Sequence, residues 1–347
     1  MTKALQAIRA GSDQPSRNAA FRHFGILALL AFAIALPAIA SPYTLFQLAG
    51  VMAFAVAALG LNVITGYTGQ VSLAHNAFFA VGAYIGAMST AYLGAGPLGS
   101  VVIAAVVSFA AGFVAGIPAQ RLRGLYLALV TLAIAVSVTP MIKQFEAYTG
   151  GVVGFRVDQP APPAWLPISQ DSWIYYLVLL FAAIAFFMTY NLLSGSVGRS
   201  FVGTKEAELA AGSLGIDVAR SKVMAFAYGS MLAGIGGALA NFSIGYIAPD
   251  SFSLMLSIGF LAAAVVGGIN TIWGAIIAGI FLQYVPSFAS DISQALSGAI
   301  YGGILIICVI VMPKGILGSL PRLIANFQTI RRESRAEATK ALNKVAN

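Results

Sequence analysis

Polar side chains with useful chemistry are scarce in this chain and gather in two short segments. The first segment, 62–76, holds amide, hydroxyl and imidazole groups, on Asn62, Thr65, Gln70, Ser72, His75 and Asn76. The second segment, 198–222, reads GRSFVGTKEAELAAGSLGIDVARSK and contains charges of both signs. Groups of the first kind can line a path for a polar solute or form hydrogen bonds between helices, because polar side chains that face lipid are costly. The charged segment suits a water-exposed contact with another protein.

Catalysis has few candidate residues. The chain contains 2 His and 1 Cys, and no nucleophile lies beside a base in an arrangement that enzymes use. The single Cys308 excludes a disulfide framework or a cysteine metal cluster. We therefore expect no catalytic residues, no cofactor and no metal site, not even at His75, and we do not expect an enzyme.

The composition is that of an integral membrane protein. Hydrophobic residues make up 59% of the chain and charged residues 9%, and the mean hydropathy is +0.88. No water-exposed surface can be built from such a chain. A helix needs about 20 apolar residues to cross a hydrocarbon core about 30 Å thick. The sequence predicts an all-α bundle of about ten transmembrane helices, at 24–41, 44–64, 72–94, 98–118, 124–142, 173–193, 223–244, 252–269, 272–289 and 297–312.

The basic residues predict the orientation. With ten spans and the N-terminus inside, all but two of the 19 Lys and Arg lie on the cytoplasmic side, the exceptions being Lys143 and Arg156. Both termini are then cytoplasmic, and the net charge of +8 faces anionic lipid headgroups rather than nucleic acid. The expected organisation is a cytoplasmic segment 1–23, a membrane domain 24–318 with a periplasmic loop 143–172 and a cytoplasmic loop 194–222, and a cytoplasmic tail 319–347.

The first apolar run has a second interpretation. Basic residues up to Arg22, an apolar run from Gly25 and the triplet Ala38-Ile39-Ala40 resemble a cleavable signal peptide. Its removal would leave nine spans and an N-terminus outside, which conflicts with the basic residues Arg121 and Arg123. We expect the run to be retained as the first span.

The charged segment 198–222 has the signals of one short helix. Thr204 is a candidate N-cap, acidic residues at Glu206 and Glu208 suit the first turn, and Gly212 or Gly215 can end the helix. The spacing places three small or apolar side chains on one face, those of Ala207, Ala211 and Leu214. Such a face fits a groove on a partner protein, and the alternative is a solvated loop that only joins two spans.

Glycine spacing predicts close contacts within the bundle. Gly82 with Gly86, and Gly112 with Gly116, are GxxxG pairs that let helices approach each other. In addition, GLNVITG at 60–66 is similar to GINTIWG at 268–274. This similarity is either a parallel internal repeat or a coincidence in a Gly-rich chain.

Five segments resemble the permease subunits of branched-chain amino acid ABC importers, and more closely the longer of the two paired subunits. They are GLNVITGYTGQVSLAHNAFFAVGAY at 60–84, YTGGVVGF at 148–155, ELAAGSLGI at 208–216, APDSFSLMLSIGFLAAAVVGGINTIWG at 248–274 and MPKGILG at 312–318. The resemblance implies a subunit of the bacterial inner membrane that has no ATPase activity of its own. The implied partners are a second permease subunit, two cytoplasmic ATP-binding subunits and a periplasmic substrate-binding protein.

The resemblance also implies roles for particular residues. The cytoplasmic loop becomes the helix that couples ATP hydrolysis to transport, with Glu208, Ala210, Ala211 and Gly215 in the contact. The polar residues of 62–76 become candidates for the translocation path, and Thr149, Gly150, Gly151 and Gly154 become a candidate outer gate or binding-protein contact. Branched-chain amino acids are the expected solute, with urea, amides or aromatic acids as alternatives. A self-contained secondary transporter or channel is the remaining alternative.

Overall fold

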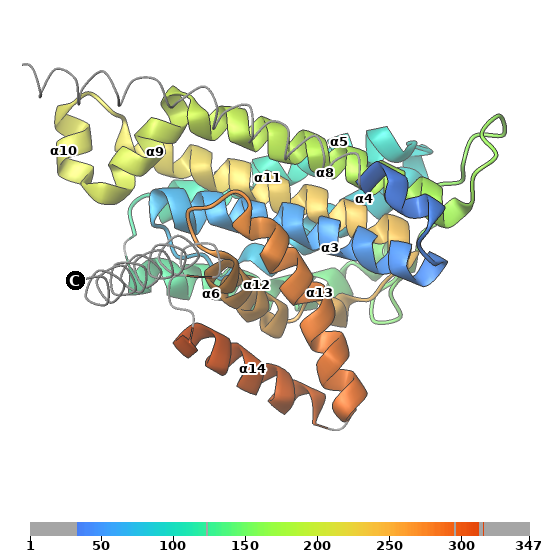
Figure 1. Cartoon of the computed structure of the whole chain (residues 1–347). Coiled ribbons are helices and arrows are strands. Elements are labelled where there is room, and N and C mark those ends of the chain that lie inside the picture. The colour runs from blue at the N-terminus through green and yellow to red at the C-terminus, as the bar shows by residue number, and fades with distance from the viewer. Residues whose placement is uncertain (1–32, 123, 295, 312–314, 316–347) are drawn as a thin grey trace, which may run out of the picture.

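The computed structural model describes residues 33–122, 124–294, 296–311 and 315. They form a bundle of α-helices whose long members run in a similar direction, with a single two-stranded sheet among the described residues (Figure 1). The predicted all-α class and multi-pass membrane character are thereby confirmed. The segments 1–23 and 319–347, half of the predicted first span and most of MPKGILG lie outside the described residues.

The helix α11, Val218–Ile244, occupies the centre of the bundle. Asp217 begins it, because its carboxylate accepts a hydrogen bond from the Arg220 N–H at 2.9 Å, as N-cap residues do. Gly245, with φ +67°, ends it in the left-handed conformation. Three further helices surround α11, namely α3 (Pro42–Leu61), α4 (His75–Leu93) and α5 (Pro97–Ala119). Protein rather than lipid therefore covers most of α11.

Small residues permit this close packing around α11. A Cβ at Gly82 would collide with the backbone of Gly234, and a Cβ at Gly112 would collide with the side chain of Ser230. Gly86 and Gly116 likewise face α11, so both predicted glycine pairs contact the same central helix. The predicted close contacts are confirmed, and they explain why α4 and α5 can flank α11 so closely.

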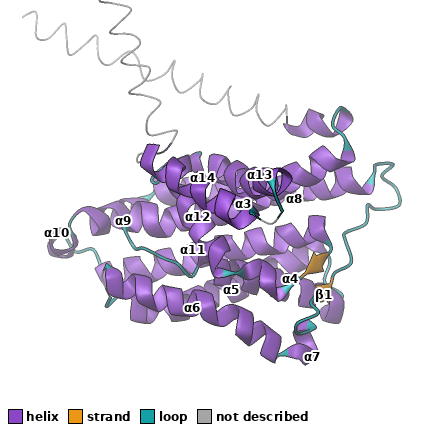
Figure 2. Ribbon diagram, turned by 90° about the horizontal axis from the view of Figure 1, so that it is seen from below, coloured by secondary structure: helices purple, strands orange, loops and turns teal. Residues whose placement is uncertain are grey.

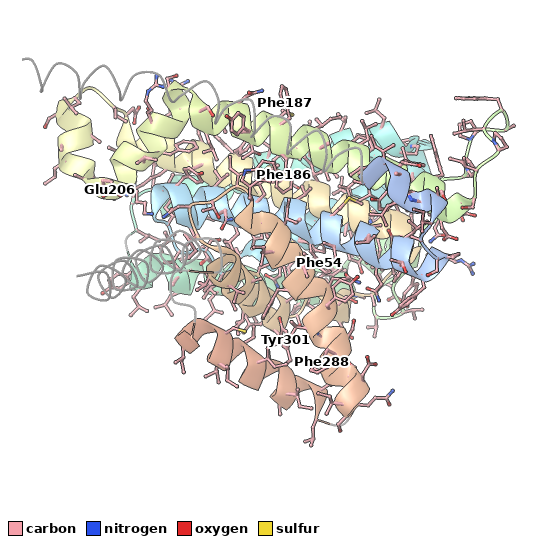
Figure 3. The ribbon with its side chains drawn as sticks, viewed as in Figure 1. Phe54, Phe186, Phe187, Glu206, Phe288 and Tyr301 are labelled. Atoms are coloured by element: carbon pink, nitrogen blue, oxygen red, sulfur yellow. The ribbon has the colours of Figure 1, made fainter. Side chains whose placement is uncertain are left out.

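A second set of helices surrounds this inner group. The helix α6 (Leu125–Gln144) contacts α4, and both α8 (Gln170–Ser194) and α13 (Gly274–Ile292) contact α3. The short helix α12 (Leu254–Gly267) packs against α13 and α14 (Ser297–Val311). Large apolar side chains point outward from this set, including Phe187 and Phe288, whereas Phe54 lies inside and stacks on Phe79 (Figure 3). An apolar exterior of this kind suits a lipid environment.

Six helices of the described part have the length and apolar character needed to cross a membrane: Pro42–Tyr67, Pro97–Ala119, Leu125–Gln144, Gln170–Ser194, Val218–Ile244 and Gly274–Ile292. The predicted span 252–269 is shorter than expected, because α12 has 14 residues and Gly268, at φ +109°, ends it. Such a helix rises about 21 Å, which is less than the hydrocarbon thickness of about 30 Å. The predicted span 72–94 begins as a helix only at His75. The number of ten spans stays a prediction.

Short elements occupy the two opposite ends of the bundle (Figures 1 and 2). We call one the α10 end; it carries α9 (Ser196–Glu206), α10 (Glu208–Ser213) and the π-helical turn η2 (Asn62–Tyr67). We call the other the β1 end. It carries α7 (Glu146–Thr149), the strands β1 (Phe155–Arg156) and β2 (Tyr246–Ile247), the turn η3 (Pro249–Phe252) and the turn η1 (Leu36–Ala38).

Candidate functional site

The charged segment folds into two short helices rather than one. Ala207 is extended, with φ −157° and ψ 95°, and separates α9 from α10. Thr204 therefore lies inside α9, where it is buried, and the prediction that it caps a helix is wrong. No Gly or Pro marks the break, and Ala is a strong helix former. The local sequence therefore contains no signal for this turn.

The break at Ala207 rotates the faces of α10 away from those predicted. Ala211 is only 3% exposed and lies near Gly203 of α9, whereas Leu209 and Leu214 are 87% and 83% exposed. The prediction of one shared face for Ala207, Ala211 and Leu214 is wrong, because Ala207 precedes the helix and Ala211 points inward. The surface presented to solvent is instead built from Leu209 and Ala210 of α10 and from Leu214, which directly follows the helix.

The C-terminal end of α10 follows the prediction. Gly215 has φ +82°, and the Ile216 N–H donates a hydrogen bond to the Ala211 carbonyl at 3.0 Å. This is the arrangement in which a left-handed glycine ends a helix. The termination is confirmed at Gly215 rather than at Gly212.

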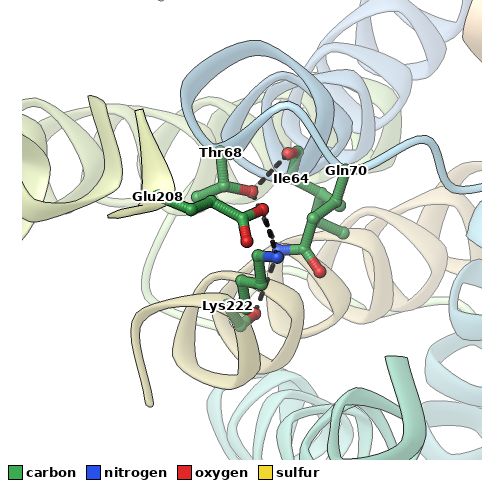
Figure 4. Close-up of polar contacts among 5 residues, drawn as sticks. All are labelled: Ile64, Thr68, Gln70, Glu208 and Lys222. Carbon is green, nitrogen blue, oxygen red and sulfur yellow. Dashed lines mark hydrogen bonds and ion pairs between the residues drawn. The ribbon is translucent and has the colours of Figure 1, made fainter. Parts of the chain in front are cut away.

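An ion pair attaches α10 to the central helix (Figure 4). The Glu208 Oε1 and Lys222 Nζ atoms are 2.5 Å apart, and the side chains are 27% and 6% exposed. Gln70 adds to this contact, since its Nε2 donates to the Lys222 carbonyl at 3.1 Å and to Thr68 Oγ1 at 2.9 Å. Thr68 in turn donates to the Ile64 carbonyl at 2.6 Å. One polar cluster thus joins α10, the first turn of α11 and the segment after η2.

A second lysine attaches α9 to two other segments. Lys205 Nζ donates to the Gly66 carbonyl at 2.8 Å and to Asn270 Oδ1 at 2.9 Å. Lys205, Lys222, Thr68 and Asn270 were not among the predicted site residues. Both lysines are among the basic residues that predict the orientation, and neither was predicted to contact the residues that were assigned a function.

The two similar segments 60–66 and 268–274 lie side by side at this end. Asn62 Nδ2 donates to the Thr271 carbonyl at 3.2 Å, and the Tyr67 hydroxyl donates to the Asn270 carbonyl at 3.2 Å. Their backbones differ, because 60–66 is helical and 268–274 forms the turn between α12 and α13. The similarity in sequence therefore does not correspond to a similarity in local conformation.

The remaining polar residues of 62–76 form hydrogen bonds between elements. The fully buried His75 places Nε2 2.6 Å from the Ala57 carbonyl of α3, and its ring packs edge-on against Phe260. Asn76 Nδ2 donates to the Phe252 and Ser253 carbonyls at 3.0 and 3.1 Å. The bonds observed within this chain thus join helices, which was one of the two predicted roles.

Some polar atoms of this segment are buried without a hydrogen-bond partner among the described residues. They are Asn62 Oδ1, Thr65 Oγ1, Gln70 Oε1, Ser72 Oγ, His75 Nδ1 and Asn76 Oδ1. Buried polar groups normally have partners, and these atoms are enclosed by the chain, so only water or a small polar molecule inside the bundle would reach them. These atoms do not line the space of about 160 Å³ near the β1 end that is bordered by Thr90, Pro97, Gln159, Asn241 and Phe242 among others.

The residues of the predicted outer gate form a hydrogen-bonded turn at the β1 end. Thr149 Oγ1 donates to the Ile142 carbonyl at 2.7 Å and accepts from the Gly151 N–H at 3.2 Å. Gly150, Gly151 and Gly154 all have positive φ, at +73°, +55° and +89°. Directly after them, β1 pairs antiparallel with β2. The structure brings the four predicted gate residues together, far from the polar residues of the α10 end.

Fold and site together define a multi-pass membrane protein that holds a pair of short helices at one end of its bundle. Residues 43–309 match the family described as "Branched-chain amino acid transport system / permease component". Because the match covers well over half of the chain, this protein belongs to that family of transport permeases. The match includes the polar segment 62–76 and both short helices.

Curated relatives carry the same description. The high-affinity branched-chain amino acid transport system permease protein LivM of Salmonella typhimurium is 30% identical over 315 residues, which cover 84% of this chain and 74% of LivM. The permease protein LivH of Escherichia coli is 25% identical, over 76% of this chain and 91% of LivH. BraD of Pseudomonas aeruginosa is 26% identical, over 76% of this chain and 91% of BraD. No solved structure matches the chain.

Proposed function

We propose that this protein is one of two membrane-spanning subunits of an ATP-binding-cassette importer for branched-chain amino acids. Its family and its similarity to LivM carry this proposal. In the proposed complex a second permease completes the pathway, two cytoplasmic ATP-binding subunits supply energy and a periplasmic binding protein delivers the solute. The chain would cross the bacterial inner membrane about ten times, with both termini and the α10 end in the cytoplasm.

The placement of charged residues supports an external source of energy. Charges on the described membrane helices lie in terminal turns, as with Lys143 near the end of α6 and Lys222 near the start of α11. A transporter driven by protons or ions usually needs ionisable groups at membrane depth. In the proposed mechanism the ATP-binding subunits hydrolyse ATP. This chain converts their movement into a switch of the solute path between inward and outward access.

The solvent face of α10 is the proposed contact with an ATP-binding subunit. Leu209 and Leu214 are large apolar side chains with more than four-fifths of their surface exposed, beside the small Ala210. Apolar anchors of this kind fill pockets at the centre of protein interfaces. On the side of α10 that faces the bundle, Glu208 binds Lys222 and Ala211 is buried. Gly215 permits the turn that follows the helix.

The solute path is proposed to run past the buried polar atoms of 62–76. Asn62, Gln70 and Asn76 each retain an amide oxygen without a partner in the described chain. These oxygens are enclosed in the described chain, so the proposal requires helices of the bundle to move apart before the oxygens meet the passing solute. The hydrogen-bonded turn at Gly150–Gly154 is proposed to act at the outer side, as a gate or as a contact for the binding protein.

Reconstitution tests the function directly. The complete complex in liposomes, with ATP inside and the cognate binding protein and radiolabelled leucine outside, is expected to accumulate leucine only when all subunits are present. Uptake by this chain alone would contradict the proposal and indicate a secondary transporter or channel. ATP-dependent uptake of urea, amides or aromatic acids in place of leucine would change the assigned solute only.

The contact face of α10 is tested by Leu214→Arg. We expect normal amounts of the variant in the membrane, because Leu214 makes little contact with its own chain, but a loss of bound ATP-binding subunits of more than about tenfold, as for an interface anchor. Affinity purification through a tag on the permease measures this retention. Val202→Arg is the matched control, since Val202 is an exposed apolar residue on the neighbouring helix α9. Equal retention in the two variants would contradict the assigned face.

A further inference from the structure

Lys205 places a positive charge at the C-terminal end of a long membrane helix. Residues Pro42–Tyr67 form one continuous helical segment of 26 residues, made of α3 and η2. The Gly66 carbonyl lies in its last turn, where carbonyl groups lack partners within the helix and the helix dipole is negative. The Lys205 ammonium donates to this carbonyl at 2.8 Å. The charge therefore satisfies the helix end and attaches it to α9.

The same ammonium group holds the turn between α12 and α13. Asn270 accepts from Lys205 through its side-chain Oδ1 at 2.9 Å and from the Tyr67 hydroxyl through its backbone carbonyl. It has φ +81° and is the only non-glycine residue with positive φ in the described part of the chain. Among non-glycine residues Asn adopts this conformation most readily, and the bonds to Lys205 and Tyr67 fix its side chain and its carbonyl in place.

The aliphatic part of the Lys205 side chain also packs against the bundle. Its Cγ lies over Gly69, which has φ +71°, and an added Cβ at Gly69 would come within 3.2 Å of it. Lys205 therefore contacts η2 and the segment after it, as well as the 268–274 turn. On the other side of the break at Ala207, Glu208 binds Lys222 of α11. Besides the apolar packing of α9, whose Phe201 lies in the core, the helix pair is thus attached to the bundle by polar side chains at two points, one on each short helix.

We propose that Lys205 is a positioning residue that transmits movement of the α9–α10 pair to the α3 helix end and the α12–α13 turn together. This inference rests on the proposed function, in which α10 receives movement from the ATP-binding subunits. A single ammonium group bonded to two segments that are far apart in the chain makes them move with α9 as one unit. The Glu208–Lys222 pair carries the movement of α10 to α11 separately.

The complete complex in liposomes tests this role through the number of leucine molecules imported per ATP hydrolysed. In Lys205→Met, which keeps the length of the stem and removes the charge, we expect ATP hydrolysis and bound ATP-binding subunits to persist. The imported leucine per ATP should fall about tenfold, as expected from the loss of two charge-assisted hydrogen bonds. Lys205→Arg retains a donor and should restore most of the ratio. Arg199→Met removes an exposed charge from the same helix and should leave it unchanged.

A second variant keeps the test decisive if Lys205→Met fails to assemble. Asn270→Gly tolerates the positive φ and removes only the Oδ1 acceptor, so it should lower the ratio in the same direction by a smaller factor. Combined with Lys205→Met it should add nothing, because both changes break the same bond. A normal ratio in assembled Lys205→Met, or in Asn270→Gly, would overturn the proposal. Failure of the proposed function is distinguishable, since the unaltered complex would then show no ATP-dependent uptake.

Discussion

The two ends of this bundle hold their short segments in different ways. At the α10 end the attachments are made by side chains, through the buried Phe201 of α9, the Lys205 ammonium and the Glu208–Lys222 pair. At the β1 end the attachments are mainly backbone, because β1 pairs with β2 and the Val157 N–H donates to the Gly245 carbonyl at 3.1 Å. The difference indicates which end can move. Side-chain bonds can break and form again without unfolding, whereas a strand ladder fixes its register.

The two ends also offer a matched pair of salt bridges. At the α10 end the Lys222 side chain is 6% exposed, whereas at the β1 end Lys143 and Asp250 are 32% and 71% exposed with their charged atoms 2.7 Å apart. Removal of one partner costs more stability when the remaining charge is buried, whereas water screens the charges of an exposed pair. Equivalent substitutions at the two ends should therefore have unequal effects.

The largest effect is expected from Lys222→Met. Breaking a buried ion pair costs about 3–5 kcal/mol, and we expect about 3 kcal/mol because Glu208 keeps some access to water. The loss should be local, so chymotrypsin, which cleaves after large apolar residues such as the exposed Leu209 and Leu214, should cut the 199–220 region faster while the bundle stays folded. Timed proteolysis of the purified protein in detergent measures this change.

Two comparisons make the Lys222 result specific. Arg220→Met removes an exposed charge two residues away and should leave the cleavage rate unchanged. Glu208→Gln combined with Lys222→Met should be less harmful than the lysine change alone, because the negative charge is removed together with the positive charge that offsets it. Equal proteolysis of Lys222→Met and Arg220→Met would show that the pair does not hold α10.

The bundle itself was largely predictable from sequence. Apolar runs of about 20 residues identify helices such as α5 and α11, because membrane helices must satisfy their backbone internally. The GxxxG pairs predicted close packing between helices, because a glycine such as Gly82 has no side chain and lets a neighbouring helix approach. What the spacing could not identify is that both pairs approach α11.

The candidate site was predictable in location but not in geometry. Gly215 has a local signal, and it ends α10 as predicted. Ala207 has none, so the break that turns Ala211 inward was missed. Lys205 binds Gly66 and Asn270, which are 139 and 65 positions away in the chain. Contacts of this range depend on how helices pack, and one sequence without its fold does not specify them.

A smaller effect is expected from Gly154→Ala at the β1 end. An alanine at φ +89° is strained, and its Cβ would also collide with the Ile247 carbonyl, so we expect a cost of about 2 kcal/mol. Gly94→Ala is the matched control, because Gly94 has φ +60° but open space around it, and should cost about 1 kcal/mol. Melting curves followed by labelling of the single Cys308 with a thiol-reactive dye compare the two. Equal shifts would mean that the contact with β2 is not tight, and the fixed character of this end would be in doubt.

The smallest effect is expected from Lys143→Met. Its comparison with Lys222→Met distinguishes the exposed ion pair from the buried one. Lys143 binds Asp250 at the β1 end with both side chains open to water, so the change should cost about 0.5 kcal/mol. High salt should lower the stability of the unaltered protein toward that of the variant, because it screens an exposed pair. The same salt should have little effect on the Lys222 contact, where water is largely excluded. If Lys143→Met destabilised the protein as much as Lys222→Met, the β1 end would depend on its side chains as the α10 end does. The contrast between a fixed end and a movable end would then fail.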